Sequence, residues 1–173
     1  MIGFRVCDRG EAEYEGSRFF GDPVVPEKWA IREPWSEGCF FLCQINLGDL
    51  KGKAGDLLPK KGLMYFFCDV NSDVPDIKVF YTSKEPDTIY EECNMGFEDD
   101  VPYDLFTDYV MEFGDAVNGF ILGEEGDDIV LFQYDPSESE VDVFRDVGGF
   151  RVLIGRDALK GLDFSSVRTE PLG

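Results

Sequence analysis

Two apolar segments of the chain carry a glutamine near their middle, and they constrain the fold more than any other feature. The first is FFLCQINL, residues 40–47, and the second is IVLFQYD, residues 129–135. Both are short and rich in residues that favour strands. Each is followed by a connection, a glycine and a second apolar segment, GLMYFF or GGFRVLI. This repetition predicts a duplicated β-unit.

We therefore expect a single domain over residues 1–173 with two pseudo-repeats, at about 38–83 and about 117–167. Gln44 and Gln133 hold the same place in the two repeats. Buried amides are usually satisfied by groups within the protein, which favours a structural role for both. In the functional alternative, the two amides line a pocket between the repeats, together with Asp135 and Asp146.

The segment at about 101–113 has a different period. Its apolar residues fall at i, i+1, i+4, i+5 and i+8, the stripe of an amphipathic helix: Leu105, Phe106, Tyr109, Val110 and Phe113. Asp100 suits the N-cap, and Gly114 suits the C-terminal stop. The predicted fold class is α+β, with a largely antiparallel sheet built from the repeated unit, one main helix at 101–113, and short helical turns.

Four segments resemble one known family. GSRFFGDPVVPEKW is similar to the Gly-Asp-Pro…Leu-Pro…Trp opening of the YwqG-like domains, a bacterial family of unknown function. FFLCQINLGDL and LLPKKGLMYFF resemble its Gln-Ile-Asn-Leu and Pro-Lys-Lys-Gly segments, and FRDVGGFRVLI resembles its closing strand pair. The resemblance runs from about residue 17 to about residue 167. It implies an α+β fold with a repeated sheet, and it brings no established catalytic residues.

Charge is the strongest indication of a partner. The chain has 16 Lys and Arg against 36 Asp and Glu, a formal net charge of −20. Such a surface repels nucleic-acid phosphates and anionic lipids, so we expect no nucleic-acid or membrane binding. A basic protein is the favoured partner, because complementary fields speed association. The alternative interpretation of the charge is that it only keeps the protein soluble.

The residues available for catalysis or metal binding are few. The chain contains no histidine, which excludes Ser-His-Asp and Cys-His catalysis and His-ligated metals. Its five cysteines lack CxxC spacing, so we expect buried thiols and neither a disulfide framework nor a metal site. DVNSDVPD, residues 69–76, resembles the start of a calcium loop but lacks the glycine and glutamate such a loop needs. We expect no catalytic residues, no metal and no cofactor.

The function we expect is a non-enzymatic acidic interaction module of the immunity or regulatory type. The acidic loop Glu124, Glu125, Asp127 and Asp128 is its predicted partner-binding segment. The alternative is a small-molecule or metal-binding domain with its pocket between the repeats, and a third option is a structural module that acts by oligomerisation. The first residues, MIGFRVCDRG, become charged too early for a signal peptide, so a cytoplasmic location is expected.

Overall fold

A computed structural model describes residues 1–8, 13–70, 75–97, 99–101, 104–138 and 148–173 of the chain. Its main element is one sheet of ten strands, in the order β12-β11-β10-β9-β1-β8-β2-β4-β5-β6. Neighbouring strands in this sheet are antiparallel: β1 Ile2–Cys7, β2 Arg18–Phe19, β4 Cys39–Asn46, β5 Leu63–Asp69, β6 Asp76–Thr82, β8 Tyr109–Gly114, β9 Gly119–Glu125, β10 Asp128–Tyr134, β11 Phe150–Gly155 and β12 Arg168–Pro171.

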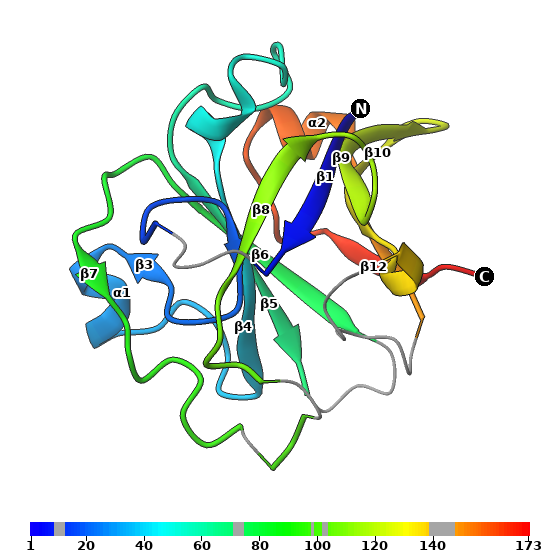
Figure 1. Cartoon of the computed structure of the whole chain (residues 1–173). Coiled ribbons are helices and arrows are strands. Elements are labelled where there is room, and N and C mark those ends of the chain that lie inside the picture. Colours follow the sequence, from blue (N-terminus) through cyan, green and yellow to red (C-terminus); the bar gives the residue numbers. More distant parts are fainter. Residues whose placement is uncertain (9–12, 71–74, 98, 102–103, 139–147) are drawn as a thin grey trace.

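The sheet curls until its two end strands approach each other, as Figure 1 shows, so that it forms a nearly closed barrel. At this seam the backbone N–H of Ile77 in β6 donates to the Thr169 Oγ1 of β12 over 2.9 Å. A side-chain hydrogen bond therefore replaces a strand ladder at the junction of β6 and β12.

Aromatic and aliphatic side chains fill the barrel interior. Phe132 of β10 lies at the centre of this core and contacts the rings of Phe4, Phe19, Phe66 and Phe150. These rings come from strands far apart in the sequence. The large core explains how a chain with 30% charged residues can fold, because burial of apolar surface offsets the loss of conformational entropy.

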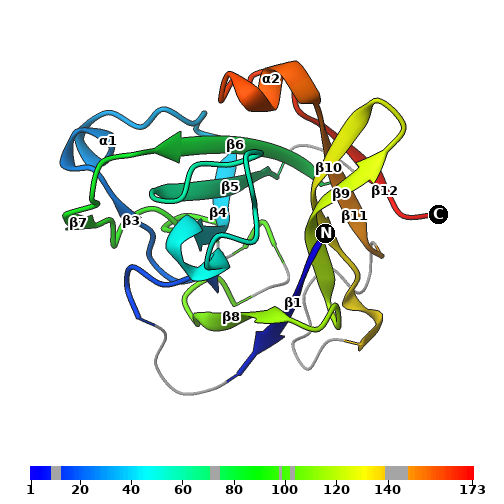
Figure 2. The same cartoon turned by 90° about the horizontal axis from the view of Figure 1, so that it is seen from above.

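A smaller layer covers the outer face of β4 and β5 (Figure 2). It consists of β3 Val24–Val25, α1 Glu27–Ile31 and β7 Thr88–Ile89, with the loops that join them, and β3 pairs with β7. Trp35 stacks on Phe67 with ring centroids 4.1 Å apart. Trp35 is buried and fastens the proline-rich segment, which contains the five-residue helix α1, to β5.

Burial on both faces accounts for the continuous apolar pattern of β4 and β5. In β4, Leu42 and Ile45 face the barrel core, whereas Phe41 faces the outer layer. A strand covered on both faces has no solvent side, so its sequence loses the alternation typical of half-exposed strands. The strands predicted from FFLCQINL and GLMYFF are confirmed.

The predicted α+β class is wrong, because the described residues are mostly β. The expected main helix at 101–113 is absent from the described part of that segment: residues 109–113 belong to β8, which pairs with β1 and β2. Phe106 is 48% exposed while Leu105 is buried, so the apparent apolar stripe is not one face. Pairing with two neighbouring strands overrides a short helical pattern.

Helices in the described residues are short. Besides α1, they are α2 Arg156–Lys160 and the 3-10 turns η1 Leu47–Leu50 and η2 Pro136–Glu138. None of the helices in the described part of the chain has the length and apolar character needed to span a membrane.

Candidate functional site

Gln44 is fully buried, and its amide holds a loop in place. The Gln44 Oε1 accepts from the backbone N–H of Val24 at 3.2 Å, and the Nε2 donates to the carbonyls of Tyr14 and Gly16 at 2.8 and 3.0 Å. These three bonds fasten the segment before β2 and the start of β3 to β4. The amide's donors and its acceptor are thus engaged within the protein.

Of the other residues predicted for the pocket between the repeats, neither Gln133 nor Asp135 lies beside Gln44. Gln133 lies half-buried on the outer face of β10, and four strands separate β10 from β4 in the sheet order. Asp135 is exposed and accepts from the N–H of Ser137 at 2.9 Å, which caps η2. Asp146 lies outside the described residues.

These placements give a matched prediction for the two glutamines. Gln44→Leu should lower the free energy of unfolding by about 1–3 kcal/mol, because it leaves buried backbone groups unsatisfied. Gln133→Leu should change it by less than about 0.5 kcal/mol, as expected for a half-exposed site. Urea denaturation of both variants measures these changes in the free energy of unfolding. Equal losses would contradict the structural role assigned to Gln44.

The predicted acidic loop lies in the β9–β10 hairpin, and arginines neutralise most of it. Glu124 pairs with Arg156 at 3.1 Å, and Glu125 pairs with Arg151 at 3.4 Å. Asp128 accepts from the guanidinium of Arg168. Asp127 is exposed. Three of the four carboxylates are thus engaged within the protein, which reduces the attraction they offer to a basic partner.

A second acidic region has no such arginines. Residues 85–144 contain no Lys or Arg. Among the described residues of 85–108, Tyr90 and Cys93 pack in the outer layer, whereas Phe97, Val101 and Leu105 pack against the barrel core. Among the described residues, its exposed carboxylates form no ion pair: Glu85, Asp87, Glu91, Glu92, Asp99, Asp100 and Asp104. Asp100 does not cap a helix as predicted, because its N–H closes a turn on the Phe97 carbonyl.

Asn94 fixes this region to the barrel. It is 1% exposed, and its Oδ1 accepts from the N–H of Phe41 in β4 at 2.9 Å. Its Nδ2 donates to the carbonyls of Gly21 and Leu105, each at 3.2 Å. One amide therefore joins three segments distant in sequence, and it orders the acidic residues on either side of it.

Apolar side chains are exposed among these carboxylates. They are Ile31 of α1, Ile89 of β7, and Met95 and Phe106 of the loop that follows, with exposures between 38% and 80%. We call the exposed residues of 27–33 and 85–108 the loop-layer surface. Exposed apolar groups surrounded by charges are typical of protein-binding surfaces.

A buried arginine lies beneath one edge of the loop-layer surface. The guanidinium of Arg18 donates to the carbonyl of Phe20 at 3.1 Å and to those of Tyr14 and Asp22. Desolvation raises the pKa of the Asp22 carboxyl, and the charge of Glu91 raises it further, while Arg18 opposes both. Asp22 therefore lies in a net negative environment despite the nearby guanidinium.

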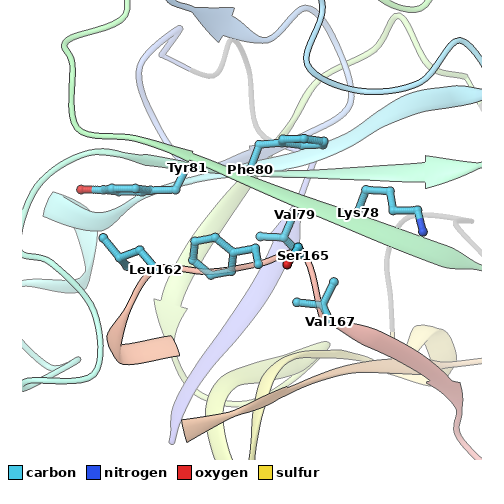
Figure 3. Close-up of a pocket in the computed structure, with 8 residues that line it drawn as sticks. Lys78, Val79, Phe80, Tyr81, Leu162, Ser165 and Val167 are labelled. Carbon is cyan, nitrogen blue, oxygen red and sulfur yellow. The ribbon is translucent and has the colours of Figure 1, made fainter. Parts of the chain in front are cut away.

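A groove occupies the seam of the barrel, between β6 and the segment that joins α2 to β12 (Figure 3). It has a volume of about 350 Å³ and is lined by Lys78, Val79, Phe80, Tyr81, Leu162, Phe164, Ser165 and Val167. One wall belongs to the first predicted repeat and the other to the second. Of the polar residues predicted for an inter-repeat pocket, the three that the structure describes, Gln44, Gln133 and Asp135, do not line it.

A second pocket of about 340 Å³ lies where β4, β5 and β6 reach their connections. Its charged lining residues are Glu15, Lys61, Lys84 and Glu85. Charges of both signs surround this space, so it has no net preference for anions or cations.

Metal and thiol chemistry find little support in the described residues. No group of three or more Asp, Glu or Cys there could hold a metal ion. In the calcium-like segment, Asp76 pairs with Lys78 at 3.1 Å, and residues 71–74 lie outside the described residues. All five cysteines are buried thiols, as predicted, and burial raises the pKa of the Cys68 thiol to about 12. A thiol with such a pKa is a poor nucleophile at neutral pH.

One comparison with known proteins decides the family. The family model described as "Domain of unknown function (DUF1963)" matches residues 17–113, more than half of the 173 residues. The chain belongs to this family. No curated protein matches the chain.

In this DUF1963 chain, the matched residues include the whole loop-layer surface and end before the β9–β10 hairpin. The buried anchors Arg18, Gln44 and Asn94 also lie in the matched part. Neither Arg18 nor Asn94 was predicted from the sequence as a functional or structural residue. The absence of Lys and Arg from residues 85–144 is the pattern that indicates the acidic surface.

Proposed function

We propose that this protein is a non-enzymatic interaction module that binds a basic protein partner through the loop-layer surface. The observation that carries the proposal is the combination of exposed carboxylates with exposed apolar side chains on residues 85–108, where the chain has no Lys or Arg. The carboxylates attract a basic partner over a distance, and the apolar groups supply contact area once it docks.

The immunity or regulatory type fits this arrangement. Such an inhibitor places carboxylates in a basic site that normally receives phosphates, and Glu91, Glu92 and Asp104 are exposed and able to do so. We also propose that the chain is YwqG-like within its family, on the motifs at residues 17–67, and that it acts in the cytoplasm.

Duplication remains part of the proposal. In β4 the register shifts between Phe41 and Cys43, and in β10 it shifts between Val130 and Phe132. Each bulge directly precedes the strand's glutamine, Gln44 or Gln133. Because a bulge is a specific local feature, its recurrence at one position supports two pseudo-repeats at about 38–83 and 117–167.

The alternative function, a small-molecule or metal-binding domain, has weaker support. The seam groove lies between the two proposed repeats, and its volume is at the lower end of the roughly 300–1,000 Å³ typical of ligand sites. Such sites also need convergent polar groups, and Gln44, Gln133 and Asp135 lie elsewhere.

Charge-neutralising variants test the leading proposal. Tagged wild-type protein is used to capture partners from native lysate at low and at moderate salt, with mass spectrometry as the readout. E91Q/E92Q should reduce capture of a stoichiometric basic protein by about tenfold, because two charges facing the partner are lost. E124Q/E125Q removes the same charge from the arginine-paired hairpin and should leave capture within about twofold.

Salt dependence completes this test. Binding led by exposed charges should weaken as salt screens them, so the captured protein should elute between the two conditions. Equal losses in the two double variants would contradict the loop-layer surface as the binding face. Empty capture at both salts would contradict the proposed function itself.

A further inference from the structure

The outer edge of β6 is open at the seam. In an antiparallel sheet, the backbone groups of successive residues point alternately to the two neighbouring strands. The N–H of Ile77 points to the seam, because it donates to Thr169. The backbone N–H groups of Val79 and Tyr81 also point to the seam, whereas those of Lys78 and Phe80 point to β5. In the described part of the chain, the ten-stranded sheet ends at β6 on this side.

The opposite wall cannot complete the ladder. This wall is the segment from Leu162 to Val167, and its backbone N–H groups bond within their own turn. Leu162 donates to Leu159, Val167 donates to Phe164, and Ser165 donates to the Asp163 side chain. The backbone groups of Val79 and Tyr81 therefore face the groove, and none of the described strands lies beside them there.

The shape of the groove suits an extended chain. Figure 3 shows Lys78 at one end and Tyr81 at the other, with Leu162 and Val167 across from β6. The space thus runs along the strand and has an apolar wall opposite the open backbone edge. A free strand edge beside an apolar groove is the geometry used in β-strand addition, where the backbone gives affinity and alternate side chains give specificity.

Charge decides which chain would occupy this groove. Two copies of this protein, each with a net charge of −20, repel each other. Lys78, the charged residue of the groove lining, is paired with Asp76 at 3.1 Å and therefore adds no net charge at this end of the groove. We propose that the groove binds one extended segment of the basic protein partner by β-strand addition to β6. The sign of the partner's charge rests on the proposed function, while the strand addition rests on the geometry of the seam.

Amide hydrogen exchange of the free, full-length protein is the first test. The N–H groups of Val79 and Tyr81 should exchange rapidly, whereas those of Lys78 and Phe80, which bond to β5, should be protected. Slow exchange at Val79 and Tyr81 in the free protein would overturn the inference, because the edge would already be occupied.

Binding is then tested with a capped seven-residue peptide of alternating valine and lysine. Its addition should protect the amides of Val79 and Tyr81, and N-methylation of the peptide's alternate amides should abolish this protection. The same peptide with glutamate in place of lysine should bind about tenfold more weakly or not at all. Equal binding of the glutamate peptide at β6 would overturn the basic character of the occupant.

Variants of β6 distinguish the contribution of the backbone N–H to peptide binding from that of the side chain. Val79→Pro removes the N–H that faces the groove and should weaken peptide binding by about tenfold, and proline is tolerated on edge strands. Val79→Ala loses at least as much packing as the proline variant but keeps the N–H, so it should bind within about threefold of wild type.

The two proposals fail in different ways. If the lysine peptide shifts only resonances of the loop-layer surface, or if N-methylation has no effect, the groove is not the site and the proposed function stands. No peptide binding at β6 at millimolar concentration would also overturn strand addition. Protection at β6 with no response from the loop-layer surface would support the groove and contradict the proposed binding face.

Discussion

Phe132→Ala is expected to lower the free energy of unfolding by about 3–5 kcal/mol, the usual loss for a phenylalanine removed from a core. Phe132 is fully buried, and its ring lies 4.9 Å from that of Phe66 and 5.3 Å from that of Phe4. These partners belong to β5 and β1, on different parts of the barrel wall. The substitution therefore leaves a cavity at the point where the wall segments meet.

Denaturation in urea measures this loss. Phe132→Leu is the control, because it keeps most of the apolar volume and should cost clearly less than the alanine variant. Small domains are stable by only about 5–15 kcal/mol, so the alanine variant should lose a large share of the total. A loss below about 1 kcal/mol would contradict the position of Phe132 at the centre of the core.

Trp35→Ala is expected to release the outer layer while the barrel stays folded. Trp35 stacks on Phe67 and lies between the rings of Trp29 and Phe80, in a cluster separate from the barrel core. Its removal should destabilise this layer by about 3–5 kcal/mol. Amide exchange should accelerate in residues 85–97 and stay slow in β9 and β10.

Trp35→Phe is the matched control. The indole Nε1 has no hydrogen-bond partner in the described part of the structure, so phenylalanine loses ring area but no hydrogen bond. The Trp35→Phe variant should keep most of the protection of residues 85–97 against amide exchange. Because the loop-layer surface depends on this cluster, Trp35→Ala should also weaken binding of a basic partner. Uniform acceleration across the whole barrel would contradict the view that the outer layer is a separate unit.

The local sequence pattern predicted β4 and β5 correctly. In β4 and β5, apolar residues cover both faces because one face meets the barrel core and the other meets the outer layer. The segment at 101–113 shows the opposite case. Its spacing matches a helix over a few residues, but β1 and β2 supply strand partners from distant parts of the chain, which a local pattern does not contain.

The candidate site was predicted only in its chemical character. The net charge pointed to a basic partner, but the predicted segment, at Glu124 and Glu125, meets arginines of β11 and α2 that lie about thirty residues later in the chain. Conversely, Asp100 was assigned to a helix N-cap and is an exposed residue of a turn instead. Which carboxylates stay accessible depends on tertiary contacts, so charge counts alone do not place the surface.

The most direct test of the loop-layer surface is an NMR titration of the ¹⁵N-labelled protein with a decalysine peptide at low salt. We predict that the largest shift changes occur at residues 27–33 and 85–108, with small changes at the β9–β10 hairpin. Changes centred on Glu124 and Glu125, or spread evenly over the surface, would contradict the central claim that the accessible negative charge gathers on the loop-layer surface, chiefly at residues 85–108.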